Sequence, residues 1–219
     1  MNPIEKVAHS LDWMTLVLFI SLVVLALGKY LYHGKFLTFI VLPFNDKYVV
    51  LHNKKGQLFN WFHILLTMFQ LMNLSLFIYL SLKTFGVLPM ETTPLMAFFL
   101  ILLGLTLFQL VKLALQGFTG FVFNTQDFIM GLVFSKTSYL NYSSIIIFMA
   151  NVILTYVATG SKTIIYSAFI LILLINGIGA VKLLKNYQKA MFPYFMYFIL
   201  YLCALEIAPL VLIGSYLKG

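Results

Sequence analysis

Residues 94–115 read PLMAFFLILLGLTLFQLVKLAL and carry no charge before Lys112. A run of roughly 20 apolar residues is long enough to cross the hydrocarbon core of a bilayer as a helix. The backbone must be helical there, because lipid offers its N–H and C=O groups no hydrogen-bond partner. This stretch therefore predicts a transmembrane helix.

Further blocks of similar length and composition lie on both sides of this run. Tyr and Trp residues near the ends of several blocks are typical of the aromatic belt at a membrane interface. The sequence predicts an all-α, polytopic helical membrane bundle of about six transmembrane helices, forming a single integral membrane domain over residues 1–219. The expected spans are residues 13–32, 58–82, 94–115, 142–159, 163–181 and 194–217.

The overall composition supports this reading and excludes several classes of protein. Of 219 residues, 62% are hydrophobic and 9% are charged, whereas a soluble domain is about half apolar and about a quarter charged. The formal net charge of +8 comes from lysines that stand singly or in pairs between apolar blocks. The chain contains no Arg, the usual bidentate reader of phosphate. We therefore expect the lipid bilayer, and no nucleic acid, as a partner.

The lysines are divided unequally between the two sides of the expected bundle. Ten lie in or beside the connections after the first, third and fifth spans, and four lie on the other side. Positive charge is concentrated in cytoplasmic connections. The sequence therefore predicts a multi-pass protein with both termini outside the cytoplasm.

Two connections have sequence features that predict regular structure. Residues 33–57 combine an amphipathic stretch with strand-like residues and a turn, so a small hairpin or an interfacial helix is expected. Residues 116–135 are punctuated by three glycines and are too polar for a span and too apolar for a free loop. An interfacial helix is favoured for this second segment over a re-entrant segment.

Glu206 stands near the middle of the sixth expected span. An ionisable group at that depth costs about 3 kcal/mol when charged and is a functional hypothesis by default. Pro209 removes a backbone N–H and kinks the helix beside it. The pair would form a proton or cation site, or a polar contact with another subunit. The alternative is a protonated Glu206 that hydrogen-bonds a neighbouring helix and stabilises packing.

Lys112 lies near the end of the third expected span, one turn after Gln109. We expect its long side chain to reach the cytoplasmic surface, with an ion pair to Asp127 as the alternative. The histidines show no metal-ligand spacing, and solvated or interfacial positions are expected for them. These four residues are His9, His33, His52 and His63.

Asn73, Asn151 and Asn176 each lie within an expected span. Such amides typically join helices by hydrogen bonds worth about 1 kcal/mol each, and lining a permeation path is the alternative. No nucleotide-binding loop, nucleophile elbow or metalloprotease motif occurs in the sequence. No catalytic residue, metal ligand or cofactor is therefore predicted.

Residues 201–210 read YLCALEIAPL. This stretch resembles the YLC-x-LE-x-x-P ending of an uncharacterised family of Bacteroidota inner-membrane proteins, domain of unknown function four-two-seven-one (DUF4271). Residues 112–123, followed by Asp127 and the fourth span, are similar to that family's basic, Phe-containing middle, and residues 45–48 also resemble the family. The resemblance implies a helical bundle in a bacterial inner membrane and implies no reaction.

These observations leave three functional hypotheses. The first is a non-enzymatic subunit or assembly factor of an inner-membrane protein complex, such as one that serves envelope export or motility, with other membrane-protein subunits as partners. The second is a small ion-coupled transporter that uses Glu206. The third is a membrane enzyme for lipid-linked substrates, which would need Lys112, Asp127 or the histidines gathered at one interface.

Overall fold

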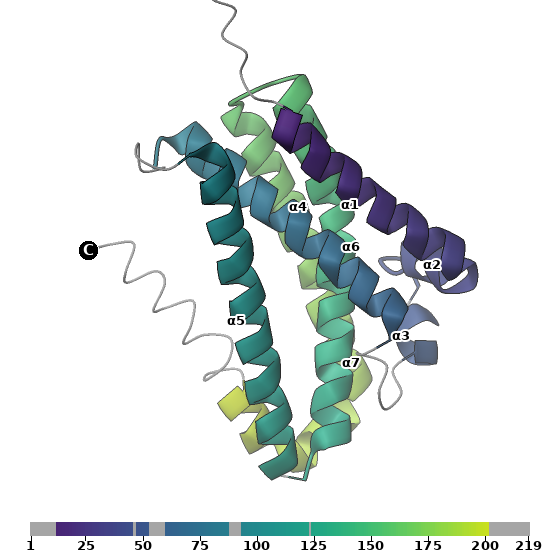
Figure 1. The fold of residues 1–219 in the computed structure, drawn as a ribbon. Helices are drawn as coiled ribbons and strands as arrows, with labels where there is room; N and C mark the ends of the chain where they lie inside the picture. Colours follow the sequence, from purple (N-terminus) through teal and green to yellow (C-terminus); the bar gives the residue numbers. More distant parts are fainter. Residues whose placement is uncertain (1–11, 46, 53–59, 88–92, 123, 202–219) are drawn as a thin grey trace, which may run out of the picture.

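The computed structural model describes residues 12–45, 47–52, 60–87, 93–122 and 124–201 (Figure 1). Within these ranges all regular elements are helices, as the sequence predicts. They are α1 (Asp12–Leu31), α2 (His33–Ile40), α3 (Lys47–His52), α4 (Trp61–Phe85), α5 (Pro94–Val122), α6 (Gln126–Tyr156) and α7 (Lys162–Tyr201).

Five of these helices are long and apolar enough to cross a membrane: α1, α4, α5, α6 and the Lys162–Leu183 part of α7. They run alternately up and down, so the end of α1, the start of α4 and the α5–α6 turn lie toward one end of the bundle (Figure 1). The exposed large side chains of α5 and α7 include many Leu, Ile and Phe residues, which suits contact with lipid tails. The chain is a multi-pass helical membrane protein.

The expectation for residues 116–135 is wrong. Helix α5 continues to Val122 and α6 begins at Gln126, so this segment is the turn of a helical hairpin. Asn124 has a left-handed backbone conformation (φ 51°), which Asn tolerates better than most residues. A Cβ atom at Gly120 would lie 3.2 Å from Cα of Gln126. Gly120 therefore allows α5 and α6 to approach closely at this point, and it does not interrupt α5.

Residues 33–40 and 47–52 form the short helices α2 and α3, so the part of this segment that the structure describes contains helices and no strand. Tyr48 and Val49 are buried against side chains of α2, α4 and α6, among them Phe39 and Phe62. This packing overrides the strand propensity of the local sequence. Burial also raises the pKa of the Tyr48 hydroxyl above its ordinary value.

Helix α7 runs without interruption to Tyr201, whereas the sequence predicts a basic connection between its fifth and sixth spans. Lysine is a good helix former, so the basic residues there do not end the helix. At 1.5 Å per residue, the part beyond Leu183 extends about 27 Å past the candidate span. The predicted sixth span, residues 194–217, begins within α7, and Glu206 and Pro209 lie outside the described residues.

The buried core has two parts. One is an apolar cluster shared by α1, α4, α5, α6 and α7, with Leu76 and Phe98 at 0% and 2% exposure. The other is an aromatic cluster in which α2 and α3 pack against α4 and α6, centred on Phe39. Together they position α4, α5 and α6, the helices that enclose the cavity described next.

Candidate functional site

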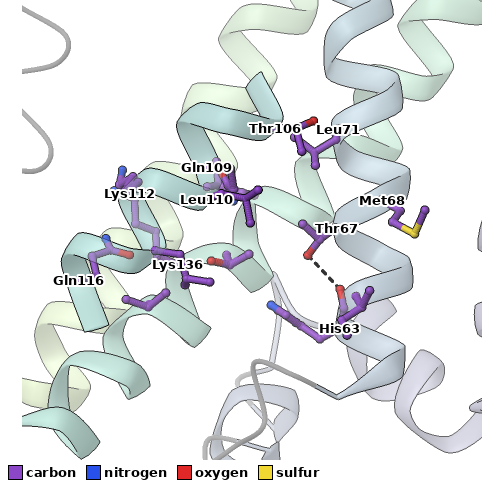
Figure 2. A pocket seen from close by; sticks show the side chains of 15 residues that line it. His63, Thr67, Met68, Leu71, Thr106, Gln109, Leu110, Lys112, Gln116 and Lys136 are labelled. Carbon is purple, nitrogen blue, oxygen red and sulfur yellow. Dashed lines mark hydrogen bonds between the residues drawn. The ribbon is translucent and has the colours of Figure 1, made fainter. Parts of the chain in front are cut away.

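A cavity of about 240 Å³ lies between α4, α5 and α6 (Figure 2). Its walls come from the first half of α4, the second half of α5 and the first half of α6, and so it lies toward the end of the bundle that holds the α5–α6 turn. A single water needs only roughly 10–15 Å³ by this measure. The space is therefore sufficient for a small molecule or for part of a larger one.

One wall of the cavity is basic and rich in amides. Helix α5 contributes Gln109, Lys112 and Gln116, and α6 contributes Lys136. Within the described chain, no Asp or Glu is among the lining residues. Figure 2 shows Lys112 and Gln116 on the α5 side of the space. This wall suits a ligand group that is negatively charged or that accepts hydrogen bonds.

His63 of α4 lines the other side of the cavity, and its side chain reaches toward the space between the helices (Figure 2). It is 3% exposed, and within the described residues neither ring nitrogen has a hydrogen-bond partner. Its ring packs on Phe134 with centroids 5.0 Å apart. The expectation of a solvated His63 is therefore wrong, because α6 covers the ring, whereas an interfacial depth for this residue stays a prediction.

Thr67 links the backbone of His63 on α4 to Asn141 on α6. Its hydroxyl donates a hydrogen bond to the carbonyl oxygen of His63 at 2.9 Å (Figure 2). The same hydroxyl oxygen accepts a hydrogen bond from Nδ2 of Asn141 on α6 at 3.4 Å. These contacts hold the cavity side of α4 against α6, so the His63 side chain projects from a defined wall.

The three asparagines of the expected spans lie further into the bundle, where Asn151 and Asn176 donate side-chain hydrogen bonds to another helix. The amide of Asn73 instead donates within α4, to the carbonyl oxygen of Phe69 at 2.9 Å, so the prediction of an interhelical side-chain bond is wrong for this residue. Nδ2 of Asn151 on α6 donates to the carbonyl oxygen of Asn73 on α4 at 2.9 Å, and Asn73 is 1% exposed. Nδ2 of Asn176 on α7 donates to the hydroxyl oxygen of Ser143 on α6 at 2.9 Å. These hydrogen bonds connect α4 to α6 and α6 to α7.

The sequence-predicted residues fall into four groups. Gln109 and Lys112 come together on the cavity wall. Asp127 is exposed in the first turn of α6, where a negative charge favours the helix N-terminus, and it is not a lining residue. The three amides lie elsewhere in the bundle. Glu206 and Pro209 are beyond the described part of the chain.

Sequence reasoning missed His63, Gln116 and Lys136. A signal for Lys136 was present, because Lys112 and Lys136 are each twelve residues from Asn124. A helical hairpin that turns at Asn124 brings such a pair to the same level. The interpretation of residues 116–135 as an interfacial helix concealed that symmetry.

The cavity gathers two lysines, a histidine and two glutamines around an apolar space. This set can hold an anion and donate hydrogen bonds to it. Among the described residues, no group of three or more His, Cys, Asp or Glu side chains could hold a metal ion. The arrangement therefore favours binding of an anionic or amphiphilic molecule.

Comparison with curated proteins and with solved structures finds no match. The sequence profile of the family described as Domain of unknown function (DUF4271) matches residues 14–217, which is nearly the whole chain. This match agrees with the resemblance seen in residues 201–210. The chain belongs to the DUF4271 family.

Proposed function

We propose that this chain is a non-enzymatic, integral subunit or assembly factor of a protein complex in the bacterial inner membrane, such as one that serves envelope export or motility. Its basic end, with the α5–α6 turn, faces the cytoplasm, because lysines are concentrated there. The N-terminus is then periplasmic. The predicted sixth span, residues 194–217, would return the C-terminus to the same side.

The observation that supports a partner is the length of the exposed apolar face of α5. Its exposed side chains are apolar throughout residues 95–122, which corresponds to about 40 Å of helix. A hydrocarbon core of about 30 Å covers only about 32 Å of a helix at the average tilt of about 20°. About one and a half turns at the end of this apolar face therefore extend past the hydrocarbon core, and they require contact with something other than lipid tails.

Those last turns carry Phe118, Phe121 and Val122, which are 66%, 74% and 55% exposed. They lie beyond Lys112 on α5, toward the charged end of the bundle. Exposed aromatic surface rimmed by polar groups is typical of protein–protein contact sites. A helix or loop of another membrane-protein subunit is the occupant that we propose for this surface.

The test combines purification with site-specific crosslinking in native membranes. A photoreactive phenylalanine at Phe121 should crosslink to a polypeptide that also co-purifies with the tagged chain in a fixed ratio. The matched control is the same substitution at Phe169, an exposed residue of α7, which should crosslink to lipid. A monodisperse monomer in which position 121 reacts only with lipid or with its own chain would contradict the proposal.

Ion-coupled transport through Glu206 stays a prediction, because that residue lies outside the described part of the chain. Asn73, Asn151 and Asn176, which would line a path in that reading, instead donate hydrogen bonds to backbone or side-chain groups. Flux into proteoliposomes that falls in Glu206→Gln would support transport. Equal flux in the variant and the parent protein would remove this alternative.

A further inference from the structure

We infer that the cavity between α4, α5 and α6 is a binding site for the anionic headgroup of a membrane lipid. The headgroup would lie between Lys112, Lys136 and His63, with its acyl chains along the apolar part of the cavity. The site would bind lipid whether or not the chain belongs to a larger complex.

The depth of the lysines fits a headgroup. Lys112 comes 18 residues after Pro94, the first residue of α5, which places it about 27 Å along the helix. The hydrocarbon core is about 30 Å thick, so Lys112 lies near its boundary. Lys136 lies at the same level on α6, because both lysines are twelve residues from Asn124. Two cations are thus held at the depth where lipid phosphates occur.

The unpartnered His63 ring supplies the second, independent observation. It is 97% buried, and within the described residues neither nitrogen forms a hydrogen bond. An imidazole carries at least one N–H donor, and a buried donor without an acceptor is unfavourable. A phosphate oxygen in the cavity would accept that hydrogen bond. An acceptor bound in the cavity would therefore remove the free-energy cost of this unpartnered donor.

The apolar lining favours a lipid over a soluble anion. Met68 and Leu110 line the cavity and are also 50% and 58% exposed. The cavity wall is therefore continuous with the outer surface of α4 and α5, which faces lipid. Leu71 and Leu140 extend the apolar lining. A soluble phosphate would leave this surface uncovered, whereas acyl chains would cover it.

The experiment uses the full chain, purified in neutral detergent and depleted of lipid. Phosphatidylglycerol is titrated, and binding is measured by native mass spectrometry and by the rise in the thermal unfolding temperature. Phosphatidylcholine and inorganic phosphate serve as parallel probes. We expect binding of phosphatidylglycerol, with phosphatidylcholine and inorganic phosphate each weaker by about tenfold or more.

The Lys112→Gln/Lys136→Gln variant should weaken phosphatidylglycerol binding by about tenfold or more. The matched control is Lys29→Gln/Lys35→Gln, which removes the same charge from the same end of the bundle, away from the cavity. That control should stay within about twofold of the parent protein. Equal losses in both variants would overturn the inference, because general attraction to a basic surface would then explain binding.

His63→Leu separates binding from folding. Without added lipid, this variant should unfold at the same temperature as the parent protein or higher, because an unpartnered polar group has been removed. Its stabilisation by phosphatidylglycerol should nevertheless be smaller. Full stabilisation of the variant by phosphatidylglycerol, or equal affinity of the parent protein for inorganic phosphate, would overturn the assignment of a lipid headgroup.

Discussion

The contact between α4 and α6 differs sharply along its length. At Asn73 and Asn151 it is closed, with both residues at most 1% exposed and joined by a hydrogen bond. At His63 the same helices border a cavity of about 240 Å³, and a buried ring lacks a partner among the described residues. Lipid provides no hydrophobic force between helices, so close packing and hydrogen bonds hold them together. The closed contact is structural, and the open one has the features of a binding site.

Helices α6 and α7 pack tightly at Gly179. A Cβ atom at Gly179 would lie 2.5 Å from Cγ of Tyr139, whose ring is buried. Gly179→Ala should therefore destabilise the protein by about 1–3 kcal/mol, the usual cost of overpacking. This is the largest effect that we predict, and the free energy of unfolding in bicelles measures it.

Gly177→Ala is the control for that variant, because no atom lies within 4 Å of the position that its Cβ would take. Alanine is the better helix former by about 1 kcal/mol, so this change should be neutral or stabilising. If both variants lost the same stability, the close α6–α7 contact would not be the cause.

Asn151→Leu should cost less, since it removes the hydrogen bond to Asn73 but replaces the amide with an apolar side chain of similar size. Interhelical hydrogen bonds in membrane proteins contribute about 0.6 kcal/mol on average and up to about 1.7 kcal/mol. We predict a loss of about 1 kcal/mol in the same measurement. Met149→Leu, at an exposed position of α6, should have no effect, and a stable Asn151→Leu protein would show that the closed contact depends on packing alone.

Thr137→Leu should have the smallest effect. Thr137 lines the cavity, so a larger side chain can enter existing space instead of displacing neighbours. We predict a change of less than about 0.5 kcal/mol in the free energy of unfolding, together with weaker phosphatidylglycerol binding. A loss as large as that of Gly179→Ala would mean that the cavity cannot accept added volume.

The spans were predictable where an apolar run has clear ends. Helices α1 and α4 occupy Asp12–Leu31 and Trp61–Phe85, close to the expected residues 13–32 and 58–82. Composition alone decides such segments, because lipid excludes every local structure but the helix. Element boundaries were harder where glycines and polar residues interrupt the run, as in the α5–α6 hairpin.

The site was predictable only in part. Gln109 and Lys112 stood out because polar residues are unusual within a span. His63 and Lys136 did not, because their relation to Lys112 depends on how three helices pack. Sequence spacing along one helix shows which residues share a face, but residues on different helices meet only through tertiary structure. The packing of the Phe134 ring on His63 is such a contact between different helices.

Membrane topology is the most direct test of the alternating helices and of their orientation. Single cysteines at Gln126, in the first turn of α6, and at Thr159, between α6 and α7, can be labelled with a membrane-impermeant maleimide after Cys203→Ser. We predict that position 126 reacts only from the cytoplasmic side and position 159 only from the periplasmic side. Labelling of both positions from the same side would contradict the membrane-spanning α6 on which this account depends.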